Sequence, residues 1–212
     1  MRVIVTRPEG QGHELASGLE ALGHEVVLCP LVRIESLGEG PIDAEGYDWL
    51  IVTSANGARE LARRLTGRPQ HVAAVGPATA AVLSEHGIDP DLVPVVASQE
   101  GLLAELPRPA GRVLVAAAEG ARRLLVDQLG ADFVPLYRTV ELRADPAPSG
   151  DLVVLASSSA ARALAALRLE LPAVSIGPQT TAAAREAGVR IVAEAETHDA
   201  QGLLKAIASL AS

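Results

Sequence analysis

The sequence predicts an α/β protein built on two doubly wound parallel sheets. Three observations favour this class. Short apolar runs alternate with helical segments along the 212 residues, and this alternation is typical of parallel sheets covered on both faces. Small and hydroxyl-bearing residues follow the apolar runs, as helix starts require. The plan of residues 48–65 also occurs a second time, in residues 151–167.

An internal repeat divides the sequence into two copies of about one hundred residues, a natural domain size. The two stretches just named each contain an apolar run, a hydroxyl-rich turn and an Ala/Leu/Arg helix. Four further segments recur: residues 2–5 return as 112–115, 30–33 as 135–138, 75–79 as 176–180, and 101–103 as 202–204. The two copies are therefore expected to contain corresponding strands and helices.

The first copy begins with a β-branched strand over residues 3–6, after which Leu15, Leu19 and Leu22 recur at helical spacing. Residues 25–28 form a second strand, and 31–35 continue extended because polar and apolar residues alternate there. A glycine-rich connector follows over 36–46. The other elements expected in this copy are strands over 50–52, 72–75 and 92–96, and helices that end near Gly67, Gly87 and Leu106.

Pro107, Pro109 and Gly111 break the chain before the second copy. That copy is expected to begin with a strand over 113–116, a helix over 121–129 and a short strand over 133–134, and residues 136–143 then alternate like 31–35. A Pro/Gly/Ser linker over 145–150 precedes the repeated stretch. The last expected elements are strands over 152–156, 174–176 and 190–192 and a helix from about 200 to 210.

The composition argues against several classes of protein. A net charge of -8 disfavours a general nucleic-acid or membrane-surface binder, because those need a basic face. The single cysteine, Cys29, excludes a disulfide within the chain and a cysteine-based metal site. The five histidines lack paired metal spacing. We find no apolar run of about 18 residues and no signal-peptide layout, so we expect a cytoplasmic protein.

Candidate binding residues lie in the turns that follow the strands. In doubly wound sheets, ligands bind beyond the carboxyl ends of the strands, where helix N-termini offer unpaired amides. Several carboxylates or phosphates could be held there with few basic side chains. The alternative is that these residues only cap helices. Neither a phosphate-loop fingerprint nor a nucleophile elbow occurs in the sequence.

Tyr137 differs from the other aromatic residues, because it follows Pro135 and Leu136 where the chain leaves a domain. A phenol at this place could donate a proton to a ligand. A structural hydrogen bond is the alternative that the sequence leaves open.

The whole chain resembles the uroporphyrinogen-III synthase family. The segments that carry the resemblance are IVTRPEGQ, DWLIVTSANGA, AAVGPATAAVL, FVPLYRTVEL and VSIGPQTTAAAREAG, in this order. The resemblance implies two flavodoxin-like lobes of five strands each, joined by a two-stranded antiparallel linker. Lobe one would combine residues 1–31 with 145–212, lobe two would span 37–138, and the linker strands would cover about 31–36 and 136–143.

The resemblance also implies a reaction in tetrapyrrole (heme) biosynthesis. The substrate would be hydroxymethylbilane, a linear tetrapyrrole with eight carboxylates, and a cyclising hydro-lyase would close it with inversion of ring D through a spiro intermediate. Lobe closure would orient the substrate. We expect no cofactor and no metal, no nucleic-acid or membrane partner, and a monomer. The competing hypothesis is a two-lobed binding or sensor protein for a small polyanion that catalyses nothing.

The resemblance assigns Tyr137 as the acid that assists loss of hydroxide. It assigns carboxylate binding, mainly through backbone amides, to the strand-end turns. The expected substrate-binding residues are Arg7, Thr53, Ser54, Ala55, Asn56, Gly76, Thr79, Ser98, Ser157, Ser158, Ser159, Gly177 and Thr180. Residues 116–118 are alanines where relatives often carry an arginine, so Arg122 or Arg123 is expected to substitute. Helix N-termini and a few arginines would make the site locally positive.

Overall fold

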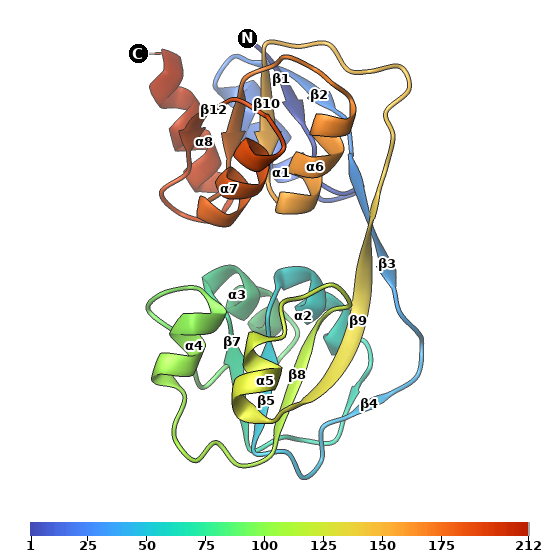
Figure 1. The fold of residues 1–212 in the computed structure, drawn as a ribbon, viewed down its shortest axis with the longest axis vertical. Coiled ribbons are helices and arrows are strands. Elements are labelled where there is room, and N and C mark those ends of the chain that lie inside the picture. The colour runs from blue at the N-terminus through green and yellow to red at the C-terminus, as the bar shows by residue number, and fades with distance from the viewer. Residues whose placement is uncertain (212) are drawn as a thin grey trace. The chain divides into compact units, whose positions relative to one another are not determined.

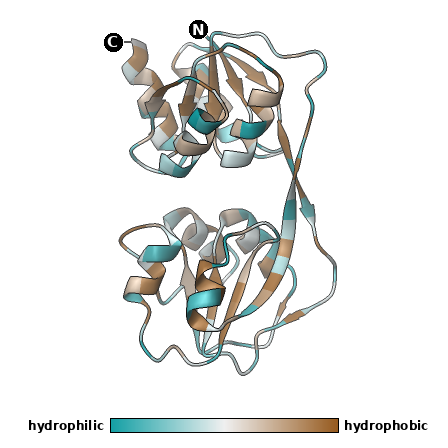
Figure 2. Cartoon of the chain, in the orientation of Figure 1, coloured by the Kyte–Doolittle hydropathy of each residue, from teal (hydrophilic) through white to brown (hydrophobic). Residues whose placement is uncertain are grey.

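The computed structural model describes residues 1–211, and the chain divides into two compact units (Figure 1). Unit 1 contains Met1–Arg33 and the chain from Thr139 onward, and unit 2 contains Ile34–Arg138. Apolar residues concentrate in the strands of both units (Figure 2). Each unit is a mixed α/β structure with a parallel sheet, as the alternating apolar runs predict. None of the helices described is long and apolar enough to cross a membrane.

Unit 1 is built on a five-stranded sheet in the order β12-β11-β10-β1-β2, and every neighbouring pair is parallel. Alternate side chains of β1 face opposite layers: Ile4 packs toward α6, whereas Val3 and Val5 pack toward α1 and α8. The sheet is therefore covered on both faces. Its strands are β1 (Arg2–Val5), β2 (Glu25–Leu28), β10 (Leu152–Leu155), β11 (Ala173–Ser175) and β12 (Ile191–Glu194), and its helices are α1 (His13–Ala21), α6 (Ser158–Ala166), α7 (Pro178–Glu186) and α8 (Ala200–Ala208).

Unit 2 has a sheet in the order β3-β9-β8-β5-β7. Leu50 and Val52 pack with α2 and α3, and Trp49 and Ile51 pack with α4 and α5 on the other face. Through the repeat, the order β9-β8-β5-β7 corresponds to β2-β1-β10-β11 of unit 1. The elements are β3 (Val32–Ser36), β5 (Trp49–Val52), β7 (His71–Ala74), β8 (Val113–Ala118), β9 (Asp132–Glu141), α2 (Ala55–Ala62), α3 (Pro77–Glu85), α4 (Gln99–Glu105) and α5 (Leu124–Leu129). The first two residues of β3 and the last three of β9 belong to unit 1.

The segments around residues 31–37 and 136–142 run antiparallel. Residue numbers of the hydrogen-bonded partners increase along one segment and decrease along the other. In unit 2, the Leu37 N–H donates to the Leu136 carbonyl at 2.9 Å. In unit 1, the Leu142 N–H donates to the Leu31 carbonyl at 2.8 Å. The expected strand 133–134 and the alternating segment after it form one continuous strand, β9.

The expected strand over 92–96 was wrong. Leu92 makes only an isolated bridge to Ala73, because Pro94 has no N–H with which to continue a ladder. Val95 is 92% exposed as a result. The fifth strand of the unit 2 sheet is β3 instead. Two further predictions were wrong. The connector over 36–46 contains the strand β4 (Ile42–Asp43), and the helix expected to end near Gly67 ends at Ala62 and is followed by the strand β6 (Leu65–Thr66), which pairs with β4.

Candidate functional site

Tyr137 and Ser54 form a hydrogen-bonded pair in unit 2. The Tyr137 hydroxyl lies 3.0 Å from Oγ of Ser54, and either atom could be the donor. Ser54 is the N-cap of α2, with extended backbone, and its Oγ accepts a hydrogen bond from the Gly57 N–H at 3.0 Å. The helix start that follows β5 therefore fixes the partner of the phenol on β9.

Gly57 lies beside both the Ser54 hydroxyl and the Tyr137 ring. A Cβ at this position would lie 3.0 Å from Ser54 Oγ and 3.8 Å from Tyr137 Cε1. The ring is 6% exposed, and burial raises the pKa of the Tyr137 phenol above 10.0, although the Ser54 hydrogen bond opposes this rise. The phenol is therefore protonated at neutral pH and can donate a hydrogen bond.

Unit 1 has the same helix cap but no phenol. Ser157 caps α6, and its Oγ accepts from the Ala160 N–H at 3.1 Å. The residue that corresponds to Tyr137 through the repeat is Val32, which is buried in the core beside Ala160. The proton-donating group is thus present in only one of the two copies.

The other candidate residues of unit 2 lie at the carboxyl ends of its strands. Thr53, Ala55 and Asn56 are half-buried where β5 enters α2, and Ser98 caps α4 by accepting from the Gly101 N–H at 3.0 Å. Gly76 is the N-cap of α3, and a Cβ there would lie 2.8 Å from that of Ala97.

Thr79 is 3% exposed, so its side chain belongs to the core. Pro77 lacks an N–H, and the amides of Thr79 and Ala80 donate to the Gly76 carbonyl. The Ala78 amide is therefore the donor that this helix start offers a ligand.

The candidate residues of unit 1 gather at the starts of α6 and α7. Ser158 Oγ donates to the Gln179 carbonyl at 3.2 Å, which ties the two helix starts together. Gly177 is buried beside the ring of His198, whose Nε2 would lie 2.7 Å from a Cβ at position 177. Thr180 is 5% exposed and, like Thr79, is a core side chain. Arg7, in the loop after β1, is half-buried.

The arginines expected to replace the missing loop arginine are both engaged within unit 2, and they precede α5 rather than lie in it. Arg122 donates two hydrogen bonds to the carboxylate of Glu100, from Nη1 to Oε1 at 2.7 Å and from Nη2 to Oε2 at 3.1 Å. This pair holds the pKa of Glu100 at about 2. The Arg123 guanidinium lies 3.5 Å from the centre of the Phe133 ring.

Two further residues lie near these helix starts and were not among the predicted site residues. His198 lies against Gly177, and its counterpart in the other copy is Ala97, which occupies the same place beside Gly76. Arg59, in the last turn of α2, reaches back to Asn56. The internal repeat was the signal that could have revealed both, because it aligns His198 with Ala97 and Arg59 with Arg162.

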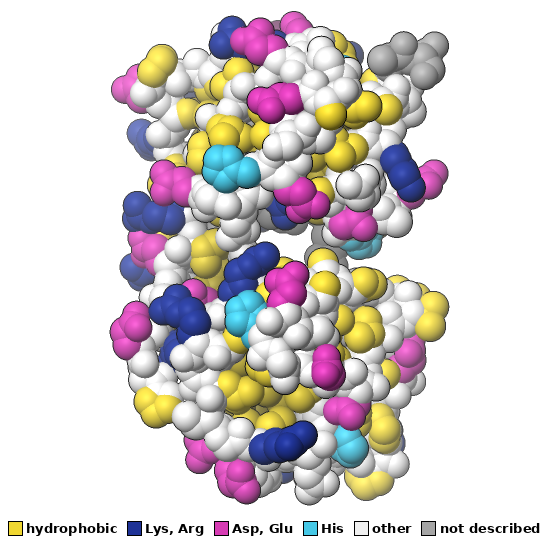
Figure 3. Space-filling view, turned by 180° about the vertical axis from the view of Figure 1, so that it is seen from behind, with side chains coloured by type: hydrophobic (Ala, Val, Ile, Leu, Met, Phe, Trp, Pro, Cys, Tyr) yellow, Lys and Arg dark blue, Asp and Glu magenta, His cyan; other side chains and the backbone are white. Residues whose placement is uncertain are grey.

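In the part of the chain that the structure describes, no group of three or more His, Cys, Asp or Glu side chains is placed to hold a metal ion. The face shown in Figure 3 carries acidic and basic side chains interspersed in both units. The described geometry offers hydrogen-bond donation by the buried Tyr137 phenol, together with anion binding at helix starts and by arginines.

Comparison with known proteins gives a consistent result. The family model described as uroporphyrinogen-III synthase HemD matches residues 13–205. The uroporphyrinogen-III synthase of Synechococcus elongatus is 28% identical over 246 residues, which cover 97% of this chain and 93% of the relative. A putative uroporphyrinogen-III synthase of Methanothermobacter thermautotrophicus is 30% identical over 71% of this chain and 67% of the relative. The match to the putative enzyme of Methanocaldococcus jannaschii, at 28% identity over 66% of this chain, spans 63% of that relative.

A solved structure is similar over nearly the whole chain. The crystal structure of a mutant uroporphyrinogen III synthase from Thermus thermophilus has a TM-score of 0.65 and 19% identity, and covers 99% of this chain and 98% of that one. At this identity the likeness concerns the fold. The family match covers far more than half of the sequence, and the chain belongs to the uroporphyrinogen-III synthase family.

Proposed function

We propose that this protein closes hydroxymethylbilane to uroporphyrinogen III, with loss of water and inversion of ring D through a spiro intermediate. The observation that carries the mechanism is the hydrogen-bonded pair of Tyr137 and Ser54 at the start of α2. The reaction balances without a redox cofactor, because the hydroxyl of the hydroxymethyl group and the hydrogen on the unsubstituted α-carbon of ring D leave as water.

The hydrogen bonds around Ser54 favour a donating role for Tyr137. Since Ser54 Oγ already accepts from the Gly57 N–H, its own proton is available for the phenol oxygen. Tyr137 can then direct its O–H toward the leaving hydroxyl of the substrate. Its raised pKa disfavours full transfer of the proton, so the phenol assists departure as a strong hydrogen-bond donor while the pyrrole nitrogen expels the hydroxide.

Substrate carboxylates are proposed to bind at the strand-end turns of each unit. In unit 2 these are the turns of Thr53, Ser54, Ala55 and Asn56, of Gly76 and Thr79, and of Ser98. In unit 1 they are the turns of Arg7, of Ser157, Ser158 and Ser159, and of Gly177 and Thr180. Because Thr79 and Thr180 are buried, these two would act by shaping the turn, and exposed amides such as that of Ala78 would make the contact.

The proposal includes two flavodoxin-like lobes, over residues 1–31 with 145–212 and over 37–138, joined by antiparallel linkers at 31–36 and 136–143. The strand order β2-β1-β10-β11-β12 of unit 1 supports it, because it is the 2-1-3-4-5 order of flavodoxin-like sheets. We also propose that the protein acts as a cytoplasmic monomer without nucleic acid.

An isomer assay tests the function directly. Hydroxymethylbilane is supplied with and without the protein, the products are oxidised to porphyrins, and types I and III are separated by chromatography. Type III that predominates only with the protein is the expected result. Type I alone, formed at the rate without protein, would favour the non-catalytic binding protein.

A further inference from the structure

Arg59 and Arg162 occupy the same place in the two units. Arg59 lies on α2 and its Nη1 donates to Asn56 Oδ1 at 3.4 Å, while Arg162 lies on α6 and its Nη2 donates to Ser159 Oγ at 3.5 Å. Each partner stands three residues earlier, in the first turn of its helix. Both copies of the repeat therefore bring a guanidinium back over the start of the helix that follows a central strand.

Arg59 stands in the last turn of the short helix α2, where a cation is ordinarily favoured, but its guanidinium reaches back to Asn56 in the first turn. The N-terminus of a helix carries partial positive charge, so a cation brought back over it is disfavoured unless an anion binds there. The arrangement occurs twice, at the turns of Thr53–Asn56 and Ser157–Ser159. A guanidinium beside such a turn adds a full charge and a planar fork of donors that fits a carboxylate.

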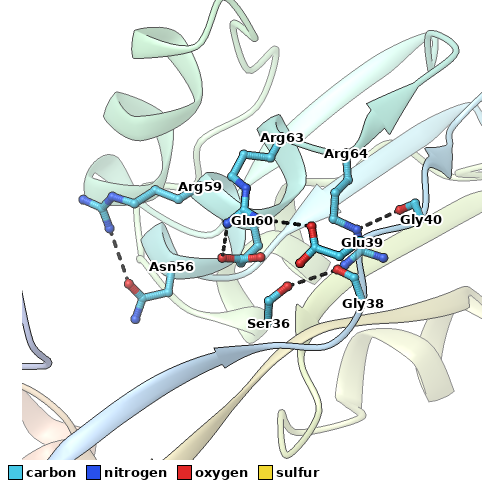
Figure 4. Close-up of polar contacts among 9 residues, drawn as sticks. All are labelled: Ser36, Gly38, Glu39, Gly40, Asn56, Arg59, Glu60, Arg63 and Arg64. Carbon is cyan, nitrogen blue, oxygen red and sulfur yellow. Dashed lines mark hydrogen bonds and ion pairs between the residues drawn. The ribbon is translucent and has the colours of Figure 1, made fainter.

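The neighbouring arginines of unit 2 bind groups of the protein instead. Arg63 pairs with Glu60 at 3.2 Å and with Glu39 at 3.7 Å, and Arg64 Nε donates to the Gly40 carbonyl at 2.9 Å. Figure 4 shows Arg59 on the far side of this network, directed toward Asn56.

Arg59 and Arg162 are both available to an external anion. Arg59 is exposed, and the contact that the structure gives its guanidinium is the hydrogen bond to Asn56. Arg162 lies 3.7 Å from Glu141, but both side chains are at least half exposed. Such a pair is weak, and a ligand carboxylate could replace Glu141 at little cost.

We infer that Arg59 and Arg162 each bind a carboxylate of the linear tetrapyrrole, one in each unit, and so position it for ring closure. The inference rests on the proposed function and extends it to side chains that the sequence analysis did not single out. It also explains how a chain of net charge -8 accepts a substrate with eight carboxylates, because the positive charge stands at two local sites.

The test replaces each arginine by glutamine, which keeps a hydrogen-bonding amide and removes the charge. Arg63→Gln on the same helix α2 and Arg185→Gln in the last turn of α7 are the matched controls for units 2 and 1. Measurements are kcat and KM for hydroxymethylbilane, and the Kd of uroporphyrin III, an unreactive octacarboxylate, by fluorescence quenching. Circular dichroism checks that every variant folds.

Arg59→Gln and Arg162→Gln should each raise KM and the uroporphyrin Kd about tenfold, as loss of a charge-assisted hydrogen bond requires. Because the two residues lie in different units, the double variant should lose about a hundredfold. Both control variants should stay within about twofold of the wild type.

Unchanged KM and Kd in the two variants, with type III still formed by the wild type, would overturn this inference alone. Equal losses in Arg63→Gln and Arg185→Gln would also overturn it, since they would indicate a general charge effect. If the wild type binds uroporphyrin through these arginines but forms no type III, the proposed function fails while the carboxylate contacts stand.

Discussion

At the scale of single residues, Tyr137 is the side chain whose removal is most informative. Tyr137→Phe keeps the buried ring and removes the hydroxyl that Ser54 holds at 3.0 Å. We expect kcat to fall about tenfold, at the low end for loss of an acid, because the pyrrole nitrogen expels hydroxide with little help. Type III should still predominate, since ring inversion depends on orientation. Single-turnover rates measure this, and a full wild-type rate would remove Tyr137 from the mechanism.

The raised pKa of Tyr137 also predicts how stability depends on pH. In the unfolded chain the phenol ionises near 10.0, whereas in the folded protein it keeps its proton to higher pH because it is buried. Proton binding therefore favours the folded state. This contribution is complete below pH 10 and is lost as the pH rises through the folded pKa.

Denaturant unfolding of wild type and Tyr137→Phe between pH 8 and pH 11 tests this sign. Above pH 10 the wild type should lose more stability than the variant, so that the difference between their free energies of unfolding changes with pH. Tyr47, whose pKa is raised mainly by its hydrogen bond to Asp132, is present in both proteins and cancels. A difference that stays constant up to pH 11 would contradict the assigned shift.

At the scale of elements, the start of α2 contributes both to the stability of the fold and to the proposed role of Tyr137. Ser54→Ala removes the helix cap and the partner of Tyr137 together. We expect about 1 kcal/mol of lost stability from the cap, and a fall in kcat because the phenol loses the donor that orients it. Asp199→Ala is the control, since Asp199 caps α8 by accepting from the Gly202 N–H at 2.7 Å. It should lose similar stability and keep kcat; equal kcat values for the two variants would separate Ser54 from the chemistry.

The helices and strands also differ in how well the sequence predicted them. The strands over 50–52 and 152–156 were predicted from their continuous apolar residues, and the observed strands β5 and β10 are buried throughout. The strands β4 and β6 have two residues each, too few to leave a periodic pattern. Val95 and Val96 favoured a strand by type, but the missing N–H of Pro94 decided against it.

At the scale of the whole molecule, the internal repeat predicted more than any single motif. It aligned β5 with β10 and α2 with α6, and the two sheets share the strand order that such an alignment requires. The repeat could not predict the hydrogen bond between Tyr137 and Ser54. That contact joins residues far apart in the chain and depends on β9 lying beside β8 in a register that shifts near Ala118. Composition and local pattern carry no trace of such a register.

The net charge of -8 and the two proposed arginine contacts together predict how salt affects turnover. Long-range repulsion between an acidic protein and a polyanion is strong at 10 mM salt, where the Debye length is about 30 Å, and largely screened at 100 mM, where it is about 10 Å. Salt therefore relieves repulsion and raises kcat/KM, while it weakens the local attraction of Arg59 and Arg162. In the wild type these effects oppose each other. The double variant Arg59→Gln, Arg162→Gln keeps only the repulsion, so its kcat/KM should rise more steeply between 10 and 100 mM. Parallel salt profiles for the two proteins would mean that the arginines do not meet the substrate's charge.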